Sequence, residues 1–189
     1  MDSIRLRKFV VLHVPSGTIN PNNTVTGTPT GARIASLRIR VQQGVPEDCI
    51  LIVIVTGAPA PNGMVAALAM KAEIDTEDIG VPVYYIFVDS YDTYGDVKDV
   101  MRQLQELDIS LDEVVQIEVI TDAVHYERFV PTYNAWGYTG QLKNVEVEAR
   151  QLNWKQQQEE KLGRWLSWHD PIGNIVLSRW IRKGRGEPQ

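Results

Sequence analysis

The chain has 189 residues, 43% of them hydrophobic and 23% charged, with a formal net charge of −5 at pH 7. These values are typical of a globular protein with one sizeable core, and they exclude a general basic surface for nucleic acid. A single cysteine, Cys49, excludes an internal disulfide and favours a reducing, cytoplasmic setting. The apolar run at residues 9–14 is too short for a signal-peptide core or a membrane span.

Apolar strand patterns alternate with helical patterns along the chain. Strands are predicted at residues 8–14, 50–56, 83–88, 114–121 and 145–149, the last with the alternation of an exposed edge strand. Helices are predicted at residues 33–43, 64–74, 97–107 and 126–136, and from an N-cap at Asn153 to about Trp168. This order predicts a three-layer Rossmann-like α/β sandwich with a mostly parallel sheet of about five strands. We expect residues 1–150 to form this domain and residues 151–189 to form a helical extension packed on it.

Ligands of such sheets lie beyond the carboxyl ends of the strands, which directs attention to the loops at residues 15–31, 57–63, 89–96 and 122–128. The first loop is rich in Gly, Pro, Asn and Thr but matches neither a Walker A loop nor GxGxxG. A binding role and a plain surface loop both stay open for it. In the second loop, Gly57 permits close backbone approach to a ligand, although a simple turn explains it equally.

The third loop crowds acids and hydroxyls into a few positions, among them Asp89, Ser90, Asp92 and Thr93. At least one of these side chains is expected to cap the following helix. The others are candidates for binding sugar hydroxyls or a cation, or for acting as a base.

The fourth loop places His125 and Arg128 three residues apart at a helix start, where both can share one face. An imidazole beside a guanidinium suits a phosphate or carboxylate, with Arg128 as a bidentate clamp and His125 as donor or general acid. The alternative is a capping histidine and an arginine paired with Glu127 or Asp122.

Several short pieces occur in a characteristic order over residues 8–149: Thr56-Gly57, Gly80-Val81-Pro82, Ser90-x-Asp92-Thr93, and Thr121 with His125-x-x-Arg128, followed by an aromatic-rich helix and Gly137. Together they resemble the YdcF-like family, which includes SanA-like and ElyC-like proteins. The resemblance implies a Rossmann-like fold, S-adenosylmethionine as a suggested ligand, and a link of some members to the bacterial cell envelope.

The chain departs from the family pattern at four places. His13-Val14-Pro15-Ser16-Gly17 replaces a glycine-rich turn, Met64-Val65 stands where Ser-Glu opens the second helix, Phe87 replaces a glutamate, and Gly95-Asp96 replaces Glu-Asn. Asp89 is near enough to substitute for the lost glutamate. We therefore expect the anion-binding half of the site to persist and the acidic half to be rebuilt.

These considerations define one set of candidate residues. The ligand-binding candidates are Ser16, Gly17, Arg33, Thr56, Gly57, Asp89, Ser90, Asp92, Thr93, Thr121, His125 and Arg128, with His125 and Asp92 also as catalytic candidates. The expected ligand is small and anionic, nucleotide-like or phosphorylated, and in the enzymatic interpretation it is hydrolysed. The alternative is a non-catalytic S-adenosylmethionine-binding or cell-envelope-associated protein. We expect no metal site, because the three histidines are far apart in sequence; enzymatic activity and oligomeric state stay open.

Four of the five tryptophans, Trp154, Trp165, Trp168 and Trp180, follow residue 150. The segment from Ile175 to Gly186 adds four cationic side chains and no acid. Such a region can lie on an anionic membrane surface, or it can pack its tryptophans on the sheet or a second subunit. We favour packing, because burial is the commoner fate of tryptophan.

Overall fold

A computed structural model describes residues 7–17, 19–57, 66–87, 92–148 and 154–173. The strands are β1 (Lys8–Pro15), β2 (Cys49–Thr56), β3 (Val83–Ile86), β4 (Val114–Thr121) and β5 (Gln141–Glu146). The helices are α1 (Pro29–Gln42), α2 (Ala66–Ile74), α3 (Thr93–Glu106), the short 3₁₀ helix η1 (Leu111–Glu113), α4 (Ala123–Ala135) and α5 (Trp154–His169). The strands form one parallel sheet in the order β3-β2-β1-β4-β5, which confirms the predicted Rossmann-like fold class.

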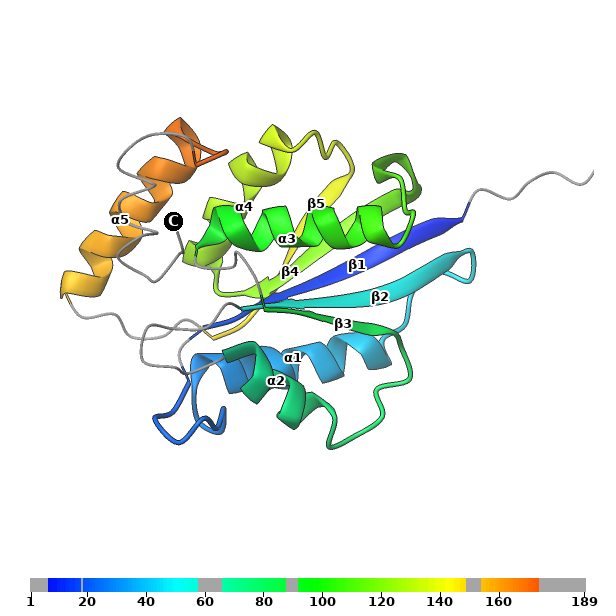
Figure 1. The fold of residues 1–189 in the computed structure, drawn as a ribbon, viewed down its shortest axis with the longest axis horizontal. Coiled ribbons are helices and arrows are strands. Elements are labelled where there is room, and N and C mark those ends of the chain that lie inside the picture. The colour runs from blue at the N-terminus through cyan, green and yellow to red at the C-terminus, as the bar shows by residue number, and fades with distance from the viewer. Residues whose placement is uncertain (1–6, 18, 58–65, 88–91, 149–153, 174–189) are drawn as a thin grey trace, which may run out of the picture.

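Two helix layers enclose the sheet. Helices α1 and α2 cover one face and α3 and α4 cover the other, while α5 lies against α4 (Figure 1). Alternate residues of the central strand β1 supply both cores, since Leu12 packs toward α1 and α2 and Val11 packs toward α3 and α4. The two faces of β1 are therefore both dry, as its nearly continuous apolar sequence predicts.

Helix α1 begins at Pro29, four residues earlier than predicted. Thr28 is its N-cap and accepts a hydrogen bond from the Gly31 amide at 3.1 Å. Pro29 occupies the first turn, where a backbone N–H would have no partner within the helix, so its missing N–H costs no hydrogen bond. A Cβ at Gly31 would lie 2.2 Å from the Val25 carbonyl oxygen, so the preceding loop folds back onto this turn. The sequence pattern missed the turn because its residues carry no apolar periodicity.

Strand β5 also differs from the prediction, since it spans residues 141–146 and not 145–149. It pairs with β4 from Gln141 opposite Gln116 onward. Leu142 packs toward α4 whereas Val145 packs toward α1, and the remaining side chains of the strand are polar. Backbone pairing with β4 defines this edge strand more strongly than its side chains do, which is why alternation placed it too late.

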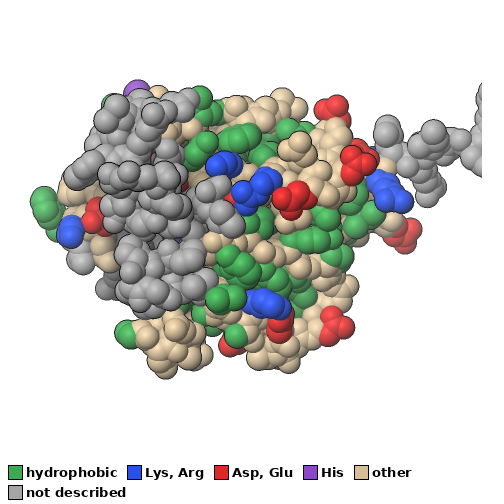
Figure 2. Space-filling view, viewed as in Figure 1, with side chains coloured by type: hydrophobic (Ala, Val, Ile, Leu, Met, Phe, Trp, Pro, Cys, Tyr) green, Lys and Arg blue, Asp and Glu red, His purple; other side chains and the backbone are tan. Residues whose placement is uncertain are grey.

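The opposite edge of the sheet is formed by β3, whose four residues include only one fully buried side chain, Ile86. Figure 2 shows hydrophobic side chains gathered across the middle of this side of the molecule, where Figure 1 places β3, with charged side chains around them. Val83 and Tyr85 are among the half-buried residues that pack against the core from this strand.

Helix α5 does not bury its tryptophans. Trp154, Trp165 and Trp168 are 75%, 49% and 59% exposed, so packing on the sheet is wrong for these three residues, whereas packing on a second subunit stays a prediction. Trp180 and the segment from Ile175 to Gly186 lie outside the described residues. Among the helices that the structure describes, none has the length and apolar character needed to cross a membrane.

A buried ion pair joins α1 to the sheet. Glu118 of β4 is 3% exposed, and its two carboxylate oxygens accept hydrogen bonds from Arg40 at 2.6 and 2.7 Å. Gln116 also donates to Glu118. The bidentate geometry offsets the desolvation of both charges, and it fixes how α1 crosses β4.

We predict that Glu118→Ala lowers the free energy of unfolding by about 3 kcal/mol, because the partly buried Arg40 guanidinium then loses its carboxylate partner. Urea denaturation measures the change. Glu118→Leu combined with Arg40→Met is the control and should recover most of the loss, since neither charge remains. A single-variant loss below about 1 kcal/mol would contradict this account.

Candidate functional site

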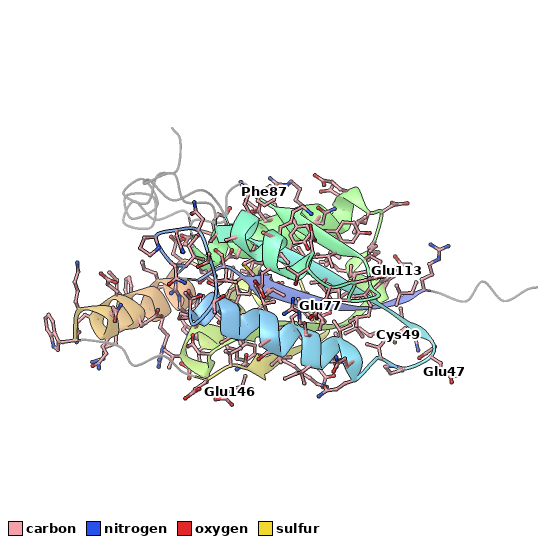
Figure 3. All side chains as sticks on the ribbon, turned by 90° about the horizontal axis from the view of Figure 1, so that it is seen from below. Glu47, Cys49, Glu77, Phe87, Glu113 and Glu146 are labelled. Carbon is pink, nitrogen blue, oxygen red and sulfur yellow. The ribbon has the colours of Figure 1, made fainter. Side chains whose placement is uncertain are left out.

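The strand order places a switch point at the carboxyl edge of the sheet, the position where open α/β sheets form the crevice that holds their ligands. From β1 the chain goes to β2 and β3 on one side and later crosses to β4 and β5 on the other, so the connections after β1 and β4 diverge. In Figure 3, Cys49 marks the start of β2, whereas Phe87 and Glu146 mark the carboxyl ends of the two edge strands. Ser16 and Asp122, which follow β1 and β4, lie between those edges.

Arg33 of α1 holds the two sides of this crevice together. Its side chain is buried, with 4% of the residue exposed, and Nη1 donates to the carbonyls of Pro15 and Ser16, both at 2.8 Å. Its Nη2 lies 3.2 Å from His125 Nδ1 and 3.7 Å from an Asp122 carboxylate oxygen. One guanidinium therefore connects the end of β1 to the start of α4.

His125 is held in one tautomer by these contacts. A guanidinium has only donors, so the Nδ1 atom that Arg33 contacts must be the acceptor. The Thr121 hydroxyl also lies 3.1 Å from Nδ1. The neutral ring then carries its proton on Nε2, 3.4 Å from Thr93 Oγ1. His125 thus directs an N–H donor toward the Thr93 hydroxyl, and a donor suits an anionic or carbonyl oxygen better than it suits proton abstraction.

Two predicted acidic-loop residues have defined places. Asp92 is the N-cap of α3 and accepts from the Gly95 amide at 2.9 Å, which answers the question of which side chain caps this helix. Thr93 is buried and faces His125. Asp89 and Ser90 lie outside the described residues. The acidic half of the predicted site is therefore represented here by one carboxylate with a capping role.

The backbone after β1 and β2 is closely packed. A Cβ at Gly57 would lie 2.7 Å from the Ser16 side chain, so glycine is required for the two strand ends to approach. The Gly17 amide donates to Thr30 Oγ1 at 3.1 Å, which ties the same loop to α1. Ser16, Gly17 and Gly57, all predicted site residues, are brought together.

Arg128 points to α5. Its Nη1 lies 3.3 Å from a Glu160 carboxylate oxygen, and a Cβ at Gly163 would lie 2.9 Å from its Cζ. The arginine hydrogen-bonded to His125 is Arg33, from the other side of the sheet. The two residues of the His-x-x-Arg motif therefore have different partners: His125 contacts Arg33 at the crevice, and Arg128 joins α4 to α5.

Beneath the crevice runs a buried polar chain that the sequence pattern did not reveal. Tyr133 OH lies 2.8 Å from His13 Nδ1, His13 Nε2 lies 3.1 Å from Thr56 Oγ1, and Thr56 donates to Asp96 Oδ1 at 2.7 Å. A consistent set of donors runs from the phenol to the carboxylate if His13 is neutral with its proton on Nε2. Only the spacing of Asp96 three residues after Thr93 hinted that it faces this region.

Burial shifts the pKa values of two groups in this buried polar chain, Asp96 and His13. The pKa of Asp96 rises to about 8, chiefly through burial, with the nearby Asp92 and Asp99 raising it further and the Thr56 hydrogen bond and Arg33 opposing. The pKa of His13 falls to about 3, through burial and then the charge of Arg33. Both groups are consequently neutral in the folded protein just below neutral pH. In the described part of the chain, no three His, Cys, Asp or Glu side chains are grouped to hold a metal ion.

The two shifts predict a specific pH dependence of stability. Between its unfolded and folded pKa values, Asp96 binds more protons in the folded state, so it lowers stability as pH rises. His13 binds fewer protons in the folded state, so it raises stability as pH rises. The two effects on stability oppose each other from about pH 4 to 6.5. From about pH 6.5 to 8 only the Asp96 effect remains, and stability should fall as pH rises, by at most about 1.4 kcal/mol per pH unit. Urea denaturation of the wild type and Asp96→Asn should show this slope in the wild type alone. Parallel curves for the two proteins would disprove it.

Comparison of the chain with protein-family models, curated proteins and solved structures returns no match in any of the three. The resemblance to the YdcF-like family accordingly stays a prediction that depends on the residues named above.

Proposed function

We propose that this protein binds a small anionic ligand, nucleotide-like or phosphorylated, in the crevice between the carboxyl ends of β1 and β4. The observation that carries the proposal is the hydrogen bond from buried Arg33 to His125 Nδ1, which directs the His125 Nε2–H donor. A buried cation that orients a second donor is costly to build for structural reasons alone.

Three helices begin at this edge and add to its positive potential. The first turns of α1, α3 and α4 follow the carboxyl ends of β1, β3 and β4, and free amides at helix starts favour anions. Caps occupy some of these amides, namely those of Gly31, Gly95 and His125. Anion recognition would therefore depend on the side chains and on the remaining amides together.

Hydrolysis of the bound ligand is the enzymatic form of the proposal. In that form His125 acts as a donor that polarises an oxygen, because its Nδ1 is engaged by Arg33. The base would be Asp92, whose Oδ1 accepts the Gly95 amide and whose Oδ2 would activate water. S-adenosylmethionine, which the family resemblance suggests, is the alternative ligand, with its carboxylate as the anion.

Native mass spectrometry of the purified protein should reveal a retained ligand. Isothermal titration with inorganic phosphate, ATP, AMP and S-adenosylmethionine then gives affinities. We predict that His125→Phe, which keeps an aromatic ring and removes the donor, weakens binding of the preferred compound by about 10- to 100-fold. Arg38→Met, which removes a partly buried cation that pairs with Glu73 and Glu77, should leave the affinity within about twofold. Unchanged affinity for every compound in His125→Phe would refute the proposal.

The separate partners of His125 and Arg128 yield a second prediction. Arg128→Met should leave ligand affinity within about twofold, because Arg128 pairs with Glu160 of α5. It should lower the free energy of unfolding by about 2 kcal/mol, since the partly buried Glu160 carboxylate loses its ion pair with Arg128. Calorimetric titration and urea denaturation of the same sample measure both quantities. If Arg128→Met weakens binding as much as His125→Phe does, the two residues act as one clamp, as the sequence spacing suggested.

A further inference from the structure

Helix α5 is attached to the domain through a polar side. Arg128 of α4 pairs with Glu160 at 3.3 Å, and Arg164 pairs with Glu127 of α4 at 2.9 Å. These two ion pairs run in opposite senses between the helices, which fixes the position of α5 along α4. An amphipathic helix of a globular protein normally makes such a contact with its apolar face.

Small residues complete the side of α5 that faces α4. Gly163 allows the Arg128 guanidinium to approach the helix backbone, where a Cβ would lie 2.9 Å from its Cζ. Ser167 is buried and donates to the Gly163 carbonyl at 2.9 Å. The attachment of α5 therefore uses ion pairs and close backbone approach, and it leaves four large apolar side chains of the helix exposed, namely Trp154, Leu162, Trp165 and Trp168.

Those side chains form a stripe on the outward side, here called the tryptophan face. At about 3.6 residues per turn, Trp154 and Trp165 project in the same direction, and Leu162 and Trp168 lie within roughly 60° of it on either side. All four are exposed. The stripe is about 21 Å long from Trp154 to Trp168, and Figure 1 shows α5 at the outer end of the molecule, beside α4 and away from the sheet.

The charges on the tryptophan face have one sign. Within the same arc lie Gln158, Lys161 and His169, and no acid. Glu159 projects roughly 120° away from the direction of Trp165, at the side of the helix. The chain carries a net charge of −5, yet no acid of α5 lies within this arc. The residues that follow, from Ile175 to Gly186, continue the pattern in sequence with four cations and another tryptophan.

We propose that the tryptophan face of α5 binds the surface of an anionic lipid membrane, as a peripheral contact that is independent of the anion-binding crevice. Indole rings prefer the boundary between water and lipid, where the ring is buried and its N–H stays hydrated. Lys161 then lies at the level of the anionic headgroups. A second copy of the chain fits less well, because a two-fold contact would oppose two acid-free faces that each carry a lysine.

Co-sedimentation of the whole protein with vesicles tests this proposal. Phosphatidylcholine vesicles with and without phosphatidylserine are compared at low and at physiological ionic strength. The wild type should bind the phosphatidylserine vesicles in a salt-sensitive manner. Trp165→Ser with Trp168→Ser should weaken binding about tenfold or more, and Lys161→Glu by about fivefold or more. Lys155→Glu makes the same charge change at the side of the helix and should have a smaller effect.

Because the altered side chains are exposed, circular dichroism and the melting temperature should match the wild type in all variants. Absence of wild-type binding to the anionic vesicles overturns the proposal. So does binding that the tryptophan double variant retains in full, including binding that depends only on Arg179, Arg182, Lys183 and Arg185. A dimer in light scattering that the double variant abolishes, without vesicle binding, would instead identify a second copy as the partner and would also overturn it.

Discussion

The buried guanidinium of Arg33 is the interaction on which the carboxyl edge of this protein depends. It comes from α1, beneath the sheet, and hydrogen-bonds the carbonyls of Pro15 and Ser16 as β1 ends. The same group contacts His125 at the start of α4, on the opposite face. Burying a cation is unfavourable unless fixed dipoles surround it, and here those dipoles come from two segments that the topology forces to diverge. The cation therefore ties the end of β1 to the start of α4 and selects the tautomer of His125.

The same low-dielectric environment explains the polar chain below the crevice. The Thr56 hydroxyl bridges the side chains of Asp96 and His13. Burial nevertheless favours the neutral form of both groups. A charged aspartate and a charged histidine would each require solvation that this core lacks. Neutral groups linked by directed hydrogen bonds satisfy the buried polar atoms and connect β1, β2, α3 and α4 without a net charge.

The first two turns of α4 have different tasks. Its first turn presents His125 to the crevice, and its next turn carries Glu127 and Arg128 to α5. Helix α5 is thus joined to the same helix that positions the site residue, although its tryptophans face away from both. The proposed anion site at the carboxyl edge and the proposed membrane contact on α5 lie on separate surfaces, so we expect that each can be altered without the other.

The sequence by itself determined the layers, the parallel sheet and the edge at which ligands of such sheets bind, because apolar periodicity and the order of strands and helices can be read along the chain. It also placed β4 correctly, since a run of β-branched residues needs no partner to be recognised. Only the tertiary structure decided which arginine meets His125, because Arg33 and His125 are brought together by packing across the sheet and no spacing encodes that contact. Likewise, Asp96 gains its shifted pKa from burial, and the tryptophans of α5 face outward because charged pairs attach the opposite side of the helix. Burial and long-range pairing are properties of the folded chain. They decided which side chains meet and which pKa values shift, within a fold that the sequence had already indicated.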